Sequence, residues 1–350
     1  MFETLRAIRS QVTFKRALIV SLLMLIVMLW WIVSRITQPK EEPRERFGAL
    51  PQPQTVHQSP HKQPSKIAVD VPEDPEFPQE IEVYRQQPVN LTQDDARRIA
   101  QAVGIQSEPE SYTNAIIFRQ DDKILSISLN GKSVSYTESL HDYLKDLNRE
   151  ALENYATQLL TQMFPESPLL KETTATTQYF SIIGVHETEL TNQDNADFSL
   201  VEVFSALNGK RIIGPLEPFG FIGMTTVSFS KQSGYTSLRT TVPGIDLSQP
   251  GIYPLRTKDM AAGELVAGNA LDSIAIPQGQ AYIKGEYGLP LDPTRAEFTQ
   301  SEIVYYYDGN PNAFLQPMYL FSGNTSLEDG TPATIKAILP AIDPQYLQSP

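Results

Sequence analysis

The hydrophobic positions near the start of the chain form one unbroken run. Residues 17–33 read ALIVSLLMLIVMLWWIV, and Ser21 is the only polar side chain among them. A helix rises about 1.5 Å per residue, so this run covers about 25 Å, and its extension to Ile36 approaches the thickness of a hydrocarbon core. The run is longer than the apolar part of a cleaved signal peptide. The pattern therefore predicts an uncleaved transmembrane signal anchor over residues 17–36.

Charges on the two sides of this run bear on its orientation. Basic residues occur in similar numbers before and after it, but Lys15 and Arg16 directly precede it, while Glu41 and Glu42 dilute the positive charge after it. Because cytoplasmic flanks are enriched in Lys and Arg, we expect a cytoplasmic tail over residues 1–16. The expected location is the cell membrane, as a single-pass protein, with the bulk of the chain extracytoplasmic.

A proline-rich and glutamine-rich stretch follows the apolar run. Residues 37–80 contain nine prolines and keep neither a helical nor a strand period. Such a composition is typical of an extended linker rather than a packed domain. His57 and His61 have the spacing of a helical metal pair, but the prolines between and around them do not allow that helix.

Beyond residue 80, three segments show helical spacing behind an N-capping residue. The candidate caps are Thr92, Asn148 and Thr257, and each precedes apolar residues at three- and four-residue intervals. Gly104 and Pro165 mark the ends of the first two helices.

Most of the remaining chain alternates apolar and polar residues, which predicts strands joined by turns. Expected strands include 114–119, 123–130, 178–190, 197–206, 225–231, 235–242, 302–307, 314–322 and 333–339. The predicted fold class is therefore α+β: a single N-terminal transmembrane helix, a disordered linker, and extracytoplasmic antiparallel sheets with a few helices. The predicted domains are 1–16 (tail), 17–36 (anchor), 37–80 (linker), 81–168 (N-terminal α+β subdomain) and 169–345 (C-terminal β-rich domain).

The composition of the chain excludes several kinds of binding and catalysis. The 350 residues include 28 basic and 41 acidic side chains, giving a net charge of −13, no cysteine and four histidines. Because a chain with this negative charge repels phosphate, we expect no nucleic-acid partner. The lack of cysteine excludes thiol catalysis, disulfides and cysteine-ligated metals. No catalytic motif is found, and the chain is predicted to be no enzyme, with no catalytic, cofactor-binding or metal-binding residues and no cofactor.

Aromatic residues cluster in the last two strong strands. Alternation places Tyr305 and Tyr307 on one face of their strand. Together with Gln316 and Tyr319 of the next strand, they are the candidate interaction surface, for a peptide or a glycan. The competing interpretation is that these rings pack in the core of a sheet.

The order of elements resembles a known architecture. The segments IVYYYDG (303–309), AFLQPMYLFSGN (313–324) and ATIKAILPAI (333–342) resemble the terminal strands of PepSY-like proteins of the YycH/YycI group, and IYPLRTKDMAAGELVAG (252–268) resembles the helix before them. Proteins of that bacterial group are membrane-anchored regulators of a two-component sensor kinase. The resemblance implies a PepSY/YycI-like C-terminal domain and a membrane-protein partner.

These observations lead to one preferred function and two alternatives. The preferred function is that of a non-catalytic, single-pass membrane protein whose extracytoplasmic domain regulates or scaffolds another membrane protein, such as a sensor kinase or a protease. The first alternative is a structural, assembly or ligand-binding role in the cell envelope. The more remote alternative is a cell-wall hydrolase.

Overall fold

The structure is a computed structural model of the chain, which divides into two compact units, Met1–Pro43 and Arg44–Pro350. It describes Met28 and residues 46–54, 64–72, 78–89, 91–128, 133–140, 148–184, 187–216, 222–277, 292–310 and 312–348. Apart from Met28, the predicted tail and anchor lie outside the described residues. The fold below is that of the second unit.

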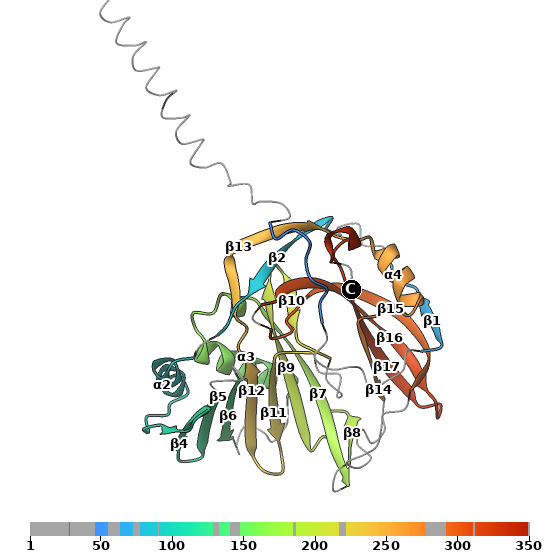
Figure 1. Cartoon of the computed structure of the whole chain (residues 1–350). Helices are drawn as coiled ribbons and strands as arrows, with labels where there is room; N and C mark the ends of the chain where they lie inside the picture. The colour runs from blue at the N-terminus through green and yellow to red at the C-terminus, as the bar shows by residue number, and fades with distance from the viewer. Residues whose placement is uncertain are drawn as a thin grey trace, which may run out of the picture. The chain divides into compact units, whose positions relative to one another are not determined.

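Nine strands form an antiparallel sheet, called the first sheet here, in the order β3-β4-β5-β6-β12-β11-β9-β7-β8 (Figure 1). Hairpins join neighbours such as β4 and β5, while β6 pairs with β12 across a long sequence separation. The strands are β3 (Glu110–Ser111), β4 (Ala115–Gln120), β5 (Lys123–Ser128), β6 (Ser133–Ser139), β7 (Thr173–Gly184), β8 (Glu187–Thr191), β9 (Phe198–Leu207), β11 (Thr225–Ser230) and β12 (Tyr235–Thr241).

The second sheet has the antiparallel order β14-β17-β16-β15 at its centre. Strands β1 and β10 both run parallel to β15 and pair with its two ends. Strand β2 pairs with the start of β16 and with β13. These strands are β1 (Lys66–Val69), β2 (Glu80–Gln86), β10 (Lys210–Ile213), β13 (Ile245–Pro254), β14 (Asp272–Pro277), β15 (Pro293–Tyr306), β16 (Phe314–Leu327) and β17 (Pro332–Pro340).

The three described α-helices begin at the capping residues that the sequence predicts. They are α2 (Gln93–Ala102), α3 (Arg149–Met163) and α4 (Lys258–Val266), and the side chains of Thr92, Asn148 and Thr257 each accept a hydrogen bond from the first turn. Helices α2 and α3 pack on one face of the first sheet, and α4 packs on the second sheet. Two short 3₁₀ helices span Pro168–Leu170 and Pro344–Tyr346.

The sheets meet at β9 and β10, which form a hairpin that passes from the first sheet to the second. Beside this hairpin, Phe204 of β9 packs with Leu320, Met318 and Ile338 of the second sheet. The two sheets therefore share a hydrophobic core near the hairpin.

The predicted fold class is wrong. The described residues form seventeen strands and three α-helices, which is a largely β fold rather than an α+β fold. Within the described residues, no helix combines the length and the apolar character that a bilayer crossing requires. The predicted anchor lies outside those residues apart from Met28, and the predicted location stays a prediction.

Two parts of the predicted linker belong to the packed unit. Leu50 is fully buried among Val83, Tyr253 and Ile342, and β1 pairs with β15. Apolar residues scattered among prolines can pack individually without any period, which explains why the sequence pattern does not reveal them.

Candidate functional site

The four residues of the candidate interaction surface are buried. Tyr305 and Tyr319 are 0% exposed, Gln316 is 2% exposed and Tyr307 is 3% exposed. The reason is that β15 and β16 are central strands of the second sheet and are covered on both faces. These residues are therefore part of the core and do not form an exposed surface.

The four side chains also lie in different places. Tyr305 and Tyr307 share one cluster, whereas Tyr319 lies in another cluster on the same face of the second sheet, beneath α4. Their hydrogen bonds are internal: the Tyr305 hydroxyl donates to the Glu82 carbonyl at 2.9 Å, and the Gln316 amide nitrogen donates to the Pro51 carbonyl at 2.7 Å. These polar groups therefore form hydrogen bonds with other segments of the same chain and do not face a partner.

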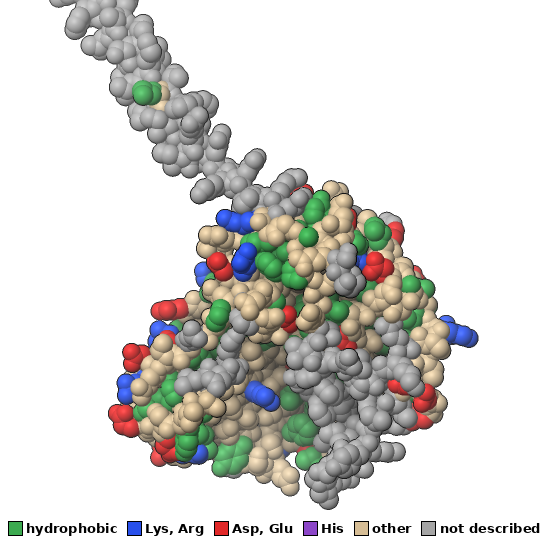
Figure 2. Space-filling view, in the orientation of Figure 1, with side chains coloured by type: hydrophobic (Ala, Val, Ile, Leu, Met, Phe, Trp, Pro, Cys, Tyr) green, Lys and Arg blue, Asp and Glu red, His purple; other side chains and the backbone are tan. Residues whose placement is uncertain are grey.

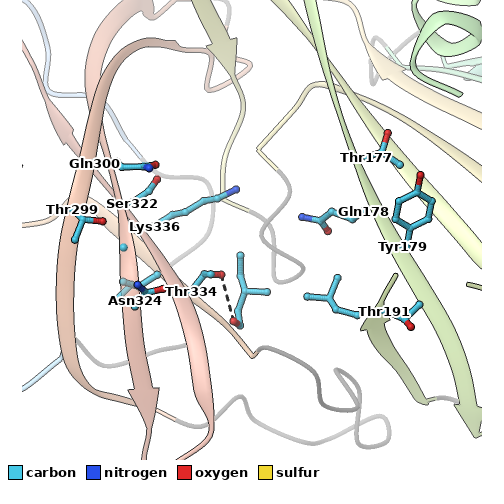
Figure 3. A pocket seen from close by; sticks show the side chains of 14 residues that line it. Thr177, Gln178, Tyr179, Thr191, Thr299, Gln300, Ser322, Asn324, Thr334 and Lys336 are labelled. Atoms are coloured by element: carbon cyan, nitrogen blue, oxygen red, sulfur yellow. Dashed lines mark hydrogen bonds between the residues drawn. The ribbon is translucent and has the colours of Figure 1, made fainter. Parts of the chain in front are cut away.

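A cleft lies between the two sheets, beyond their shared core (Figure 3). Its volume is about 550 Å³. One wall comes from β7 and β8, and the other comes from β14, β15, β16 and β17. The lining residues are Thr177, Gln178, Tyr179, Leu190, Thr191, Ile276, Thr299, Gln300, Ser322, Gly323, Asn324, Thr334, Ile335 and Lys336.

Strand register determines which side chains share the wall of the second sheet. Gln300 pairs with Ser322, and Ser322 pairs with Lys336, so the three side chains form a row across β15, β16 and β17. Lys336 and Gln178 point toward one another across the cleft (Figure 3). Tyr179 points away from the cleft, toward the helix-covered side of the first sheet.

Charged groups concentrate where the cleft meets the shared core. Glu202 of β9 is 2% exposed, and one carboxylate oxygen accepts hydrogen bonds from the backbone N–H groups of Ile222 and Gly223, both at 2.8 Å. Arg211 forms a salt bridge with Glu302, and its guanidinium lies 4.6 Å from the centre of the Phe204 ring.

Burial shifts the pKa values of Glu202 and Lys336 in opposite directions. Loss of solvation raises the pKa of Glu202, an effect that the Gly223 N–H group and the positive charge of Lys336 oppose. Loss of solvation lowers the pKa of Lys336, while the negative charge of Glu202 acts in the opposite direction. Two positive and two negative groups, Lys336 and Arg211 with Glu202 and Glu302, thus compensate one another.

The arrangement offers hydrogen bonds rather than a reactive centre. Its amide and hydroxyl side chains each donate and accept, which suits a ligand with both kinds of group, such as a peptide backbone. Within the residues that the structure describes, no cluster of three or more His, Cys, Asp or Glu side chains could hold a metal ion. All four histidines of the sequence lie outside those residues.

The cleft residues could not be recognised from sequence patterns alone. Gln178, Gln300, Ser322 and Lys336 lie in strands, and Gln178 and Gln300 are each more than twenty residues from the other three. One local signal was present, the run of polar residues from Thr299 to Glu302 in β15. Without knowledge of the register, such a polar run is typical of a loop and does not indicate a strand.

No family model and no curated protein sequence matches the chain. Seven chains of solved structures match. One is the crystal structure of an uncharacterised protein from Eubacterium rectale, which is 10% identical and has a TM-score of 0.44. The match covers 79% of this chain and 89% of that one.

Proposed function

We propose that the chain is a non-catalytic binding protein that holds an extended segment of a partner protein in the cleft between its two sheets, and thereby regulates or scaffolds that partner. The observation that carries this proposal is the cleft itself, about 550 Å³ and lined mainly by uncharged polar side chains. A peptide in extended form exposes alternating N–H and C=O groups, and Gln178, Gln300 and Ser322 can satisfy both.

The charged groups at the end of the cleft also indicate what charge the bound segment carries. Because the four charged groups at the end of the cleft compensate one another, a charged side chain placed there would lose hydration without gaining a net opposite charge. The bound segment is therefore uncharged where it passes Lys336. The resemblance to YycH/YycI proteins adds the prediction that the partner is a membrane protein, such as a sensor kinase.

Site-specific crosslinking tests this proposal. A photoreactive benzoylphenylalanine replaces Gln178 in the full chain, which is expressed in its native host and irradiated, and the adducts are identified by mass spectrometry. Thr161 carries the same group in the control, because it is exposed on α3, on the other side of the first sheet. We expect one partner to be recovered from position 178 through a single short segment and not from position 161.

A second variant distinguishes binding in the cleft from binding nearby. Gln300 is exposed, so Gln300→Trp is expected to fold and to fill the cleft with a large ring. Crosslinking from position 178 should then be lost, whereas a Thr161→Trp variant should retain it. Equal adducts from positions 178 and 161, no adduct from position 178, or full capture in Gln300→Trp would each contradict the proposal.

A further inference from the structure

A second surface occupies the face of the first sheet opposite α2 and α3, and the register continues it through β9 to Gln178 at the edge of the cleft. In β6, buried Val134 and Tyr136 point to the helices, so Ser135 and Thr137 point to the opposite face. The same alternation holds in β12, where Leu238 is buried between Ser237 and Arg239. We call this surface the hydroxyl face; its residues are Ile124, Ser126, Ser135, Thr137, Thr226, Ser228, Tyr235, Ser237 and Arg239.

The register aligns these residues into two rows. The first row runs from Ile124 through Thr137 and Ser237 to Ser228, one residue from each of β5, β6, β12 and β11. The second row runs in the same way through Ser126, Ser135, Arg239 and Thr226. Neighbouring strands are about 4.8 Å apart, so hydroxyl groups recur at about this interval along each row.

The hydroxyl face carries few charged side chains for a chain with so large a net charge. The chain carries a net charge of −13, yet the two rows contain one charged side chain, the exposed Arg239. In Figure 2, the middle of the face toward the viewer is mostly tan, the colour of uncharged polar side chains and backbone. Such a surface neither attracts a cation nor repels a neutral polymer, and it favours an uncharged, hydroxyl-bearing ligand.

An aromatic ring stands at one end of the hydroxyl face. Tyr235 is 46% exposed and occupies the same side of β12 as Ser237 and Arg239. A half-exposed ring offers a flat apolar platform beside polar groups. Sugar rings have the matching character, with apolar C–H faces and hydroxyl groups around the edge.

These features together indicate the occupant. The interval of about 4.8 Å between strands is close to the length of one pyranose unit, so successive sugars of a linear chain would each meet a new strand. A second protein copy fits less well, because stable interfaces have apolar cores and the rows offer mainly serine and threonine. We propose that the hydroxyl face binds a neutral, linear glycan that lies across β5, β6, β12 and β11.

A glycan array tests this inference on the full chain. The array displays neutral and anionic linear oligosaccharides of increasing length, and hits are titrated with the free oligosaccharide. We expect binding to neutral glycans of four or more units. Tyr235→Ala should weaken binding about tenfold by removing the stacking platform, and Ser237→Glu should abolish it by placing a charge in the row.

Matched controls separate a local effect from a general one. Tyr112 is another exposed tyrosine, 56% exposed and outside the rows, so Tyr112→Ala should bind normally, as should Thr161→Glu on α3. Absence of binding to every neutral glycan, preference for anionic glycans, or full binding by Ser237→Glu would overturn the inference. A dimer that Ser237→Glu dissociates, without glycan binding, would identify the face as a contact between copies. Because purified protein and glycans suffice, the result does not depend on the partner proposed for the cleft.

Discussion

Glu202 of β9 and Lys336 of β17 come from different sheets, and the charge of each favours the charged form of the other. Glu202 is almost fully buried, so its ionised form depends on Lys336 and on two backbone N–H groups. The pair lies where the shared core of the sheets gives way to the cleft. Its protonation therefore links the stability of the junction to pH.

Glu202→Gln should remove part of the dependence of stability on pH. Burial raises the pKa of Glu202 in the folded state above its ordinary value of 4.5, so between these two values the folded state binds more protons than the unfolded state. The free energy of unfolding contributed by this group is therefore greatest below pH 4.5 and is lost as the pH rises through the raised pKa. Urea unfolding at several pH values from 4 to 7 measures this loss.

The glutamine variant should lack that contribution, because its amide oxygen can still accept both N–H groups but cannot bind a proton in this range. Glu297→Gln is the control, since Glu297 is exposed. Parallel pH profiles for wild type and Glu202→Gln would show that the pKa of Glu202 is the same in both states.

Lys336→Met tests whether the two charges are coupled. The substitution keeps an apolar stem but removes the charge that helps Glu202 to ionise, so we expect the free energy of unfolding at pH 7 to fall by about 1–3 kcal/mol. In Glu202→Gln/Lys336→Met the loss should be smaller than the sum of the single losses. Denaturant unfolding of the four proteins gives the coupling, and strict additivity would show that the residues act independently.

Local structure was largely predictable from the sequence. Thr92, Asn148 and Thr257 each cap the helix predicted for them, because a cap and an apolar stripe are local signals. The expected strand over 178–190 is instead two antiparallel strands, β7 and β8, because the alternation of apolar and polar residues continues across both. Fold class depended on pairings such as β6 with β12, which no local pattern contains.

The candidate sites were less predictable for a related reason. The sequence favoured Tyr305 and Tyr319 because aromatic residues stand out, but a central strand buries both of its faces. Gln178 and Lys336 belong to no recognisable sequence motif. Only the packing of the two sheets brings them into one cleft. The serine and threonine of β6 and β12 become rows only once the register is known.

Gly323→Ala should destabilise the second sheet strongly. A Cβ atom at Gly323 would lie 2.0 Å from the backbone oxygen of Glu297, at a β-bulge between β15 and β16. Because two backbones would have to separate, we expect a loss of at least about 2 kcal/mol in the free energy of unfolding. Gly263 of α4 is the control: a Cβ there meets no atom within 4 Å, so Gly263→Ala should stabilise by about 0.5–1 kcal/mol. Equal effects in denaturant unfolding would contradict the close approach.

Leu50→Ala tests whether the segment before β1 belongs to the folded unit. Leu50 is fully buried, its N–H group donates to the Tyr346 carbonyl at 2.8 Å, and its carbonyl accepts from the Gln348 N–H group at 2.7 Å. Truncation should leave a cavity beside Tyr253 and cost about 2–4 kcal/mol. Gln52 is exposed, so Gln52→Ala should change the free energy of unfolding by less than about 0.5 kcal/mol.

Guanidinium unfolding of the full chain, followed by far-ultraviolet circular dichroism, measures both Leu50→Ala and Gln52→Ala. A flexible linker would make them indistinguishable, because neither side chain would lose contacts on truncation. A packed segment instead requires that Leu50→Ala lower the unfolding midpoint while leaving the slope with denaturant unchanged. A fall in the slope as well would mean that the segment unfolds separately from the sheets, and the bridge between Leu50 and Leu347 would then be too weak to join it to the cooperative unit.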